Sequence, residues 1–255
     1  MKNLCKLYRD KKVLVLIPGG NLGDGMIYAG ARILFKKFNI IYNEITRSRF
    51  VNMKGRWDTL FIYGCGGYCK SFHSMTDPII LEKMKMFRNV FILPSSFDCT
   101  EPKVKSFIKK IPNHVTIYCR EKYSFDQIKA IRKSDVFLDH DTAIHIDWKN
   151  IKTPGKGILN AFRTDRESIY SIVPENNKDV SLLVRGWKSW YQWKLMVDEI
   201  NRYEEVHTDR THVSLAAAFL GKITHVYPDN YHKVKGIYEY TLAKFPNVKF
   251  HEFNC

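Results

Sequence analysis

The sequence predicts an α/β fold with parallel strands, arranged in two domains of which the second is smaller. The first observation is the apolar run at residues 13–17, which shows no polar alternation and is therefore typical of a strand buried on both faces. The second is the helical spacing of the apolar residues that follow it over 24–38. The third is that such strand–helix units recur along most of the chain, which favours parallel sheets with right-handed crossovers and helices on both faces.

The first domain is expected to span residues 1–147. Its strands are predicted at 13–17, 39–45, 59–65, 89–95, 115–119 and 135–139, and its helices at 24–38, 76–87, 101–110 and 122–132. Residues 148–156 then interrupt the alternation. Because they are polar and contain Pro154 and Gly155, we predict a linker there.

The second domain is expected to span residues 148–255. Its strands are predicted at 157–162, 180–184, 204–207 and 222–227, and its helices at 188–201, 211–220 and 232–243, with the last helix a candidate to pack back on the first domain. In open parallel sheets, ligands bind beyond the carboxyl ends of the strands. We therefore expect a cleft between the two domains, with the functional residues directly after the strands.

The composition is that of a globular protein with a strongly basic surface. The 255 residues hold 41 lysines and arginines against 26 acidic residues, so the net charge of +15 favours anionic partners. Because the basic residues are scattered, we expect steering of an anionic substrate rather than nucleic-acid binding. Peripheral contact with an anionic membrane face stays open. No apolar run reaches the roughly 20 residues that span a bilayer, and residues 1–12 do not resemble a secretion signal, so a cytoplasmic protein is expected.

The cysteines and histidines do not form a recognisable metal motif. The six cysteines, at positions 5, 65, 69, 99, 119 and 255, match no zinc-binding spacing. Because disulfides are rare in the cytosol, buried free thiols are expected, although Cys65, Cys99 and Cys119 follow predicted strands and could converge. Around Asp141, satisfied histidines in a turn are favoured over metal ligands. No metal site is therefore expected.

A glycine-rich turn, Gly19 to Asp24, follows the first strand and opens the first helix. Strand, glycine turn and helix N-terminus together present backbone N–H groups to an anion. A phosphorylated or carboxylated small molecule is the first candidate ligand. The turn has the spacing of neither the Walker loop nor the dinucleotide fingerprint. The alternative is an ordinary strand-to-helix turn in which glycine permits tight packing.

Three further clusters follow strands of the first domain. In the stretch Gly64-Cys65-Gly66-Gly67, the glycines allow the backbone to approach a ligand closely. In the stretch Pro94-Ser95-Ser96-Phe97-Asp98, the two hydroxyl groups could bind a ligand or cap the next helix. The third cluster is Arg120-Glu121-Lys122-Tyr123-Ser124.

The cluster Thr208-Asp209-Arg210-Thr211-His212 marks the start of a predicted helix in the second domain. Asp209 or Thr208 is expected to cap that helix, which leaves Arg210 and His212 in its first turn, beside the positive end of the helix dipole. An arginine binds carboxylate or phosphate through parallel N–H bonds, and a histidine beside it can move a proton near neutral pH. The alternative is a surface arginine and a histidine that merely close the helix end.

Two other groups could contribute to the same cleft. Arg163 and Arg166 follow the strand predicted at 157–162 and could add positive charge. Four aromatic residues at the mouth of a predicted helix could stack on a sugar ring or pack in the core. These are Trp187, Trp190, Tyr191 and Trp193.

These clusters, in this order, resemble the polysaccharide pyruvyl transferase family. The matching pieces are Gly20-Asn21-Leu22-Gly23-Asp24, the glycines around Gly66-Gly67, Arg120-Glu121 with Ser124, and Arg210-Thr211-His212. The likeness runs from about residue 13 to residue 228. It implies two Rossmann-like domains that face a cleft, a fold similar to GT-B glycosyltransferases, with the acceptor on the first domain and the donor on the second.

The resemblance implies a transferase that moves the pyruvyl group of phosphoenolpyruvate to a sugar of a cell-surface polysaccharide, such as an exopolysaccharide, as a ketal. Protonation of C3 of this enol phosphate makes C2 electrophilic, and a sugar hydroxyl attacks C2 as phosphate leaves. Such chemistry needs an acid, cationic groups and a base, but no redox cofactor and no obligatory metal. The expected partners are phosphoenolpyruvate and a sugar acceptor that is lipid-linked or nucleotide-linked.

Together, the clusters and the resemblance give the expected site residues. The catalytic residues are His212, as the acid, Arg210, which would bind phosphate or carboxylate, and Asp24. The residues expected to bind substrate are Asn21, Gly66, Gly67, Ser95, Arg120, Glu121, Ser124 and Arg163. The base is left open among Asp24, Asp98, Glu121 and Asp141.

The chain departs from the family pattern at several points, which leave the acceptor sugar open. Thr211 stands where an aliphatic residue is usual, and Asp139-His140-Asp141 replaces a proline–aspartate pair. Two other functions also stay open. One is a GT-B-like glycosyltransferase that uses a nucleotide sugar, which is disfavoured because the second domain shows no convincing acidic residue for a nucleotide. The other is a non-catalytic protein that binds glycan or nucleic acid.

Overall fold

The computed structural model describes the whole chain except residues 56, 73–74, 133–134 and 253–255. The chain divides into two compact units. The first comprises Met1–Gly19 and Gly30–His145, and the second comprises Gly20–Ala29 and Ile146–Cys255. The predicted boundary after residue 147 lies next to Ile146. The second unit thus includes a short segment near the N-terminus, which opens the first long helix.

The first unit contains a six-stranded parallel sheet with the strand order β2-β1-β3-β4-β5-β6. Its strands are β1 (Lys12–Ile17), β2 (Ile41–Thr46), β3 (Trp57–Ile62), β4 (Phe87–Ser95), β5 (Val115–Cys119) and β6 (Val136–Leu138). All six confirm the predicted strands to within a few residues. In β1, every residue after Lys12 is buried, as the uninterrupted apolar run predicts.

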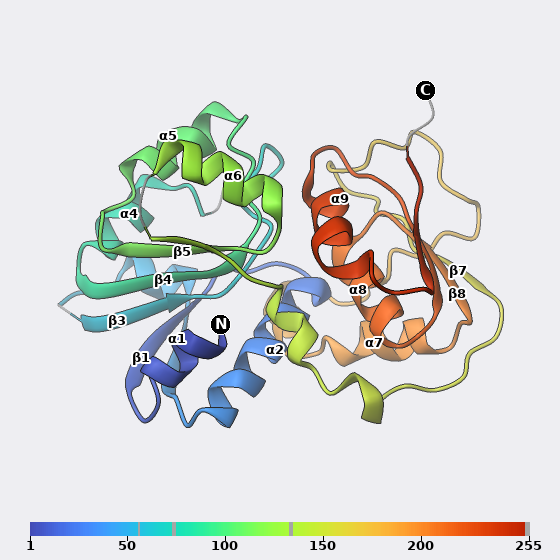
Figure 1. Cartoon of the computed structure of the whole chain (residues 1–255), viewed down its shortest axis with the longest axis horizontal. Helices are drawn as coiled ribbons and strands as arrows, with labels where there is room; N and C mark the ends of the chain where they lie inside the picture. Colours follow the sequence, from blue (N-terminus) through green and yellow to red (C-terminus); the bar gives the residue numbers. More distant parts are fainter. Residues whose placement is uncertain (56, 73–74, 133–134, 253–255) are drawn as a thin grey trace. The chain divides into compact units, whose positions relative to one another are not determined.

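Helices cover both faces of this sheet (Figure 1). Apolar residues of α4 (Pro78–Met84), α5 (Pro102–Lys110) and α6 (Lys122–Ile131) join those of the strands in one core cluster. On the other face, beside α1 (Lys2–Leu7) and α2 (Leu22–Lys37), the Tyr8 ring lies 5.2 Å from those of Phe61 and Phe91. The helices α1 and α3 (Arg47–Val51) were not predicted, because segments this short show no helical period.

The cysteines of the first unit are buried free thiols, as expected. Cys65, Cys99 and Cys119 belong to the same core cluster. Burial raises the pKa of the Cys99 thiol to about 12, so this residue behaves as a small apolar side chain at neutral pH. Cys255 lies outside the described residues.

The second unit contains a four-stranded parallel sheet with the order β10-β9-β8-β7. Its strands are β7 (Ile158–Asn160), β8 (Glu205–Thr208), β9 (Ile223–Val226) and β10 (Val248–Phe250). Figure 1 shows α7 (Lys194–Asn201), α8 (Thr211–Phe219) and α9 (Lys233–Ile237) gathered on one side of these strands. The parallel α/β fold class is therefore confirmed in both units.

Two predictions for the second unit need correction, and one strand was missed. Residues 180–184 are not a strand: Val180–Leu182 form the short 3-10 helix η3, in which Ser181 contacts Met196 of α7. A short apolar run does not distinguish a buried strand from a buried turn. The helix predicted at 188–201 is divided between the 3-10 helix η4 (Gly186–Trp190) and α7. The strand β10 was missed because it is only three residues long.

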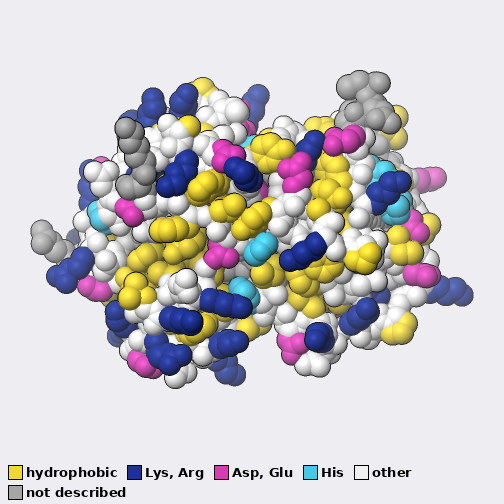
Figure 2. Space-filling view, in the orientation of Figure 1, with side chains coloured by type: hydrophobic (Ala, Val, Ile, Leu, Met, Phe, Trp, Pro, Cys, Tyr) yellow, Lys and Arg dark blue, Asp and Glu magenta, His cyan; other side chains and the backbone are white. Residues whose placement is uncertain are grey.

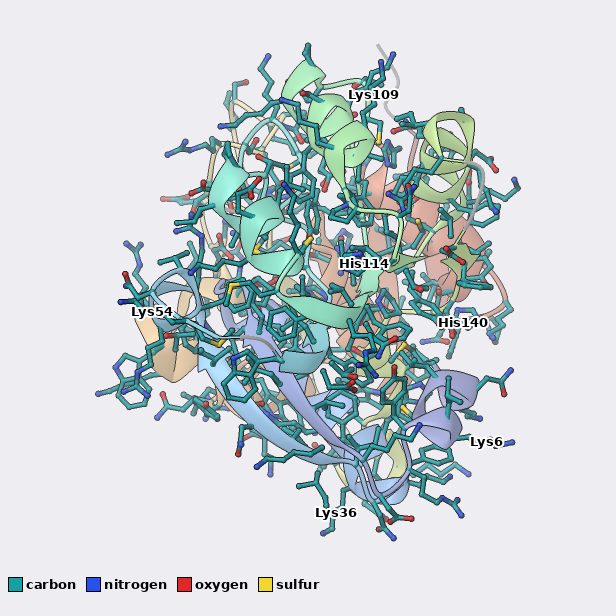
Figure 3. All side chains as sticks on the ribbon, turned by 90° about the vertical axis from the view of Figure 1, so that its left-hand side faces the viewer. Lys6, Lys36, Lys54, Lys109, His114 and His140 are labelled. Carbon is teal, nitrogen blue, oxygen red and sulfur yellow. The ribbon has the colours of Figure 1, made fainter. Side chains whose placement is uncertain are left out.

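Basic side chains are spread over the surface rather than collected in one stripe. Figure 2 shows lysines and arginines over much of one face, with acidic side chains among them. Figure 3 shows Lys6, Lys36, Lys54 and Lys109 pointing outward from different parts of the first unit. In the described part of the chain, no helix combines the length and the apolar character needed to cross a membrane.

Candidate functional site

The start of α2 is held together by its own side chains. Oδ1 of Asn21 accepts a hydrogen bond of 2.8 Å from the backbone N–H of Gly23. Oδ2 of Asp24 accepts one of 2.9 Å from the backbone N–H of Asn21. This reciprocal arrangement is a capping box, which satisfies N–H groups that a helix start leaves unpaired. Asn21 and Asp24 thus fix the shape of the turn at the N-terminus of α2.

His212 lies against this turn, within the second unit. A Cβ atom added to Gly23 would stand 2.7 Å from Nδ1 and 3.0 Å from Cβ of His212, so only glycine fits at this position without a shift. The His212 side chain is half-buried in the first turn of α8. The structure therefore brings together two motifs, around Gly23 and around His212, that are almost 190 residues apart in the sequence.

The capping prediction for α8 was wrong. Arg210 itself occupies the N-cap position, and its side chain makes no capping hydrogen bond. The Thr208 hydroxyl instead donates to the carbonyl of Ala161 and accepts from the backbone N–H of Arg210. Oδ1 of Asp209 accepts a hydrogen bond of 2.8 Å from the backbone N–H of Arg163. Both side chains also bond to the segment at the end of β7, and neither occupies the N-cap position of α8.

Arg210 is held by two carboxylates. Its Nε lies 2.6 Å from Oδ1 of Asp179, and its Nη2 lies 2.9 Å from Oδ2 of Asp165 and also contacts Asp179. The side chain is only 5% exposed. None of these hydrogen bonds with described residues uses Nη1. The guanidinium is thus fixed in position by Asp165 and Asp179, and it keeps one nitrogen for a further acceptor.

Arg163 lies in the same buried network of charges. It pairs with Asp165 at 2.8 Å and Asp229 at 3.3 Å, and it contacts Glu167. Glu167 and Asp229 are also paired with Lys233, at 2.8 Å and 3.2 Å. The members of this charge network are Arg163, Asp165, Glu167, Asp179, Asp209, Arg210, Asp229 and Lys233. Its carboxyl groups outnumber its cations.

Burial is the largest influence on the pKa of Asp165 and on that of Asp209. For Asp165 it would raise the pKa, but hydrogen bonding to Arg163 and the charge of Arg210 lower the pKa to about 2. For Asp209, the pKa-lowering effect of the same two arginines does not offset the pKa-raising effect of burial, and the pKa rises to about 6. Oδ2 of Asp209 has no hydrogen-bond partner among the described residues. A protonated Asp209 would reduce the surplus of negative charge, and a carboxyl group titrating near pH 6 is typical of functional sites.

The first-unit residues form a second network, at the carboxyl edge of the six-stranded sheet. Arg120, 1% exposed, donates from Nε to the Ser96 hydroxyl at 2.9 Å and pairs through Nη1 with Asp141 at 2.7 Å. The Ser95 hydroxyl donates to the carbonyl of Leu93 and accepts from the backbone N–H of Cys65. These buried bonds join the loops after β3, β4, β5 and β6.

Glu121 is the N-cap residue of α6, and its side chain caps the helix at Ser124. The Glu121 carboxylate accepts from the backbone N–H of Ser124 at 2.9 Å, and the Ser124 hydroxyl accepts from the backbone N–H of Phe97 at 2.7 Å. Both residues are fully buried. Gly66 and Gly67 are half-buried, in the loop directly after β3. In this unit, the two glycines therefore leave backbone accessible, while Ser95, Glu121 and Ser124 hold the loops in place.

Each carboxylate considered as a base has a partner in the structure. Asp24 belongs to a capping box and Glu121 caps α6. Asp141 pairs with Arg120, and Asp98 accepts from the backbone N–H of Thr100. The sequence analysis missed the carboxylates around Arg163 and Arg210. A usable signal was the charged run Arg163 to Glu167, which comes directly after a strand.

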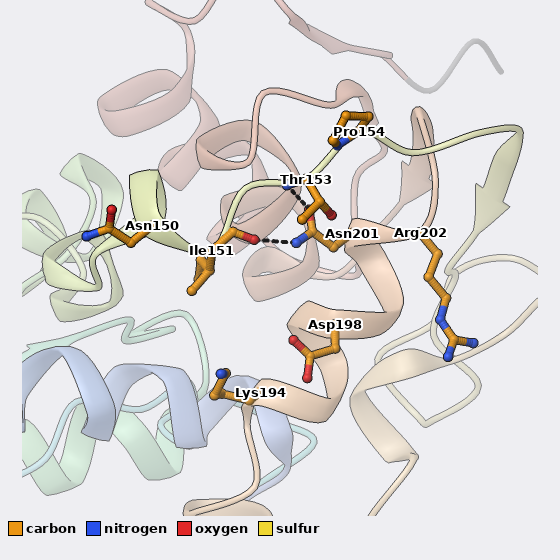
Figure 4. Close-up of a pocket in the computed structure, with 8 residues that line it drawn as sticks. All are labelled: Asn150, Ile151, Thr153, Pro154, Lys194, Asp198, Asn201 and Arg202. Carbon is orange, nitrogen blue, oxygen red and sulfur yellow. Dashed lines mark hydrogen bonds between the residues drawn. The ribbon is translucent and has the colours of Figure 1, made fainter.

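The structure also contains an open pocket of about 440 Å³ that holds none of the predicted residues. It lies between the linker after η2 (Trp148–Asn150) and α7 (Figure 4). Asn201 joins the two segments by hydrogen bonds with Ile151 and Thr153.

The four aromatic residues predicted near the cleft, Trp187, Trp190, Tyr191 and Trp193, differ in exposure. Trp187 and Tyr191 are more than half exposed, at 63% and 52%. These two can reach a ligand from solvent.

In both parallel α/β units, polar clusters lie beyond the ends of the strands, which is where open α/β sheets bind their ligands. A family model described as polysaccharide pyruvyl transferase matches residues 21–227, and the chain belongs to that family. Membership indicates an enzyme that transfers pyruvyl groups to polysaccharide. The chain is also similar, with 27% sequence identity and a TM-score of 0.81, to the crystal structure of a functionally uncharacterised protein from Klebsiella pneumoniae subsp. pneumoniae NTUH-K2044. The likeness covers 98% of this chain and 96% of that one, and no curated protein matches the chain.

Proposed function

We propose that this protein transfers the pyruvyl group of phosphoenolpyruvate to a pair of hydroxyls on a sugar, with release of phosphate. The packing of His212 on Gly23 is the observation that carries this proposal. It joins the motifs at residues 20–24 and 210–212 at two helix N-termini, where backbone N–H groups and helix dipoles favour an anion. Phosphoenolpyruvate, with its phosphate and carboxylate, is such an anion.

His212 donates the proton in this proposal, because histidine is the side chain that changes charge near neutral pH. The proton goes to C3 of phosphoenolpyruvate and converts its methylene group to a methyl group. One sugar hydroxyl attacks C2, the second hydroxyl closes the ketal, and the C2–oxygen bond to phosphate breaks. The two hydroxyl protons balance the proton taken up at C3 and the one carried away by phosphate.

Arg210 binds the phosphate or carboxylate through the nitrogen that Asp165 and Asp179 leave unused. Those two carboxylates hold the guanidinium still, so that binding an anion costs little additional side-chain entropy. Gly66 and Gly67 offer backbone to the acceptor. Ser95, Arg120, Glu121 and Ser124 hold the loops around those glycines, and Arg163 is proposed to act through the network it shares with Arg210.

The acceptor is a sugar of a cell-surface polysaccharide or of its lipid-linked or nucleotide-linked precursor. A lipid-linked precursor would bring a cytoplasmic enzyme to the inner face of the membrane, and the net charge of +15 suits an anionic lipid surface. In this proposal the first unit binds the acceptor and the second unit binds the donor.

Isothermal titration calorimetry tests the donor. Phosphoenolpyruvate, UDP and GDP are titrated into the wild-type protein, Arg210→Lys and the control Arg202→Lys. Lysine keeps the charge that Asp165 and Asp179 need but lacks the planar fork, so Arg210→Lys is expected to weaken phosphoenolpyruvate binding about tenfold or more. Arg202 is 75% exposed, and its variant should bind like the wild type. Binding of UDP or GDP with phosphoenolpyruvate inert would support glycosyl transfer instead. If the protein binds none of these three compounds, a non-catalytic protein would be supported.

A further inference from the structure

A group of side chains on the four-stranded sheet belongs to neither charged network. Glu205 and His207 are two positions apart on β8, so their side chains stand on the same face of the sheet. His225 on β9 lies directly beside His207 in the parallel register. Val206, between Glu205 and His207, and its register partner Thr224 are buried on the opposite face.

The polar atoms of these three side chains converge. Oε1 of Glu205 lies 2.7 Å from Nε2 of His207 and 3.6 Å from Nε2 of His225, and the two imidazole rings stack with centroids 4.4 Å apart. All three potential ligand atoms lie within 4.8 Å of one another. A metal ion bound at about 2.0–2.1 Å to each would need ligand atoms roughly 3.3 Å apart in a tetrahedral site. The observed distances from Oε1 of Glu205 to the two Nε2 atoms, 2.7 Å and 3.6 Å, lie on either side of that value.

The second nitrogen of each histidine is held by another side chain. Nδ1 of His207 lies 3.0 Å from the hydroxyl of Tyr227, and Nδ1 of His225 lies 2.7 Å from Nε2 of His251. Such outer hydrogen bonds fix the ring orientation and the tautomer of metal-binding histidines. Here they leave Nε2 of both rings pointing toward Glu205. Each of the three inner side chains is 22–28% exposed, so an ion can enter from solvent.

We propose that Glu205, His207 and His225 form a binding site for a divalent transition-metal ion, with Zn²⁺ as the best-suited common ion. Imidazole and carboxylate together suit this class, whereas Mg²⁺ and Ca²⁺ prefer oxygen ligands alone. Tyr227 and His251 are positioning residues for the two histidines. The sequence analysis expected no metal because these ligands come from separate strands and have no motif spacing.

A metal at this site would link β8 to β9, because its ligands come from both strands. Through His251, which follows β10, it would also restrain the segment after the last strand. Because the ligands come together only in the folded chain, metal binding stabilises the native state and raises its melting temperature.

Zinc titration of the tag-free full chain, in competition with a chromogenic chelator, tests this proposal. The wild type is expected to bind one Zn²⁺ per chain and to melt at a higher temperature with Zn²⁺ than with EDTA. His207→Gln and His225→Gln should lose the bound ion and the shift in melting temperature. His251→Gln should weaken the affinity about 10- to 100-fold.

His114→Gln is the matched control. His114 is exposed in the first unit (Figure 3), and its replacement should leave zinc stoichiometry and the melting shift unchanged. Circular dichroism without metal establishes that each variant is folded. Absence of zinc binding by the wild type would overturn the proposal. So would full zinc binding by both His207→Gln and His225→Gln. None of these readouts depends on transferase activity, so this test and that of the proposed function fail independently.

Discussion

The contact between Gly23 and His212 gives the sharpest test of the proposed acid. In Gly23→Ala, the added Cβ would stand 2.7 Å from Nδ1 of His212, whereas nonbonded heavy atoms pack at about 3.5–4.0 Å. The added atom would also lie 3.0 Å from Oδ1 of Asn21, so the ring cannot remain where it is while the capping box stays intact. The imidazole must move by roughly 1 Å.

The expected effect is large on turnover and small on stability. A displacement of roughly 1 Å in a reacting group costs about 100-fold in rate. Alanine is favoured over glycine in a helix by about 1 kcal/mol, which offsets part of an overpacking cost of about 1–3 kcal/mol. Affinity for phosphoenolpyruvate should stay close to the wild-type value, because Arg210 does not contact the added methyl group in this account.

The assay measures phosphate release from phosphoenolpyruvate in the presence of an acceptor, together with calorimetric affinity and thermal unfolding. Gly19→Ala is the control: the added Cβ meets nothing within 4 Å, and only the positive φ of +104° opposes it. It should lose some stability and keep its turnover. In a His212→Gln background, Gly23→Ala should have no further effect on turnover. Wild-type turnover by a folded Gly23→Ala would refute the role given to His212.

Two other predictions concern the buried charges. The pKa of Asp209 is raised from 3.8 to about 6 in the folded state, so the stability that its protonation contributes is full below pH 3.8 and is lost as the pH rises through 6. Asp209→Asn should therefore be more stabilising at pH 8 than at pH 4, by up to about 3 kcal/mol, and equal melting shifts at both pH values would contradict this. Arg120→Met should cost about 3–5 kcal/mol in urea unfolding, because it removes the positive charge that pairs with the buried carboxylate of Asp141. The double variant with Asp141→Leu should recover most of that loss, and no recovery would show that the pair is not the cause.

The strands of the first unit could be predicted because each is an apolar run between turn residues. The helix α1 and the strand β10 could not, because their few residues show no period and depend on packing and pairing with distant parts of the chain. The same limit explains the error at residues 180–184, where the apolar residues pack against α7 rather than pair in a sheet.

For the candidate site, the sequence indicated which segments matter but not what their side chains touch. The turn at residues 20–24 and the pair Arg210 and His212 were identified by their places after strands. Sequence spacing does not show that Asp165 and Asp179 hold Arg210, since both come from a long irregular segment after β7. Nor does it show the histidine cluster, which exists only because the parallel register sets β8 beside β9.

Transfer of the pyruvyl group itself is the most direct test of the central claim. The wild-type protein is incubated with phosphoenolpyruvate and a panel of nucleotide-linked and lipid-linked sugars, and the products are examined by mass spectrometry while phosphate is measured. The account predicts a sugar carrying one ketal-linked pyruvyl group for each phosphate released, and no such product with His212→Gln. A sugar transferred from the nucleotide, with phosphoenolpyruvate unchanged, would contradict it.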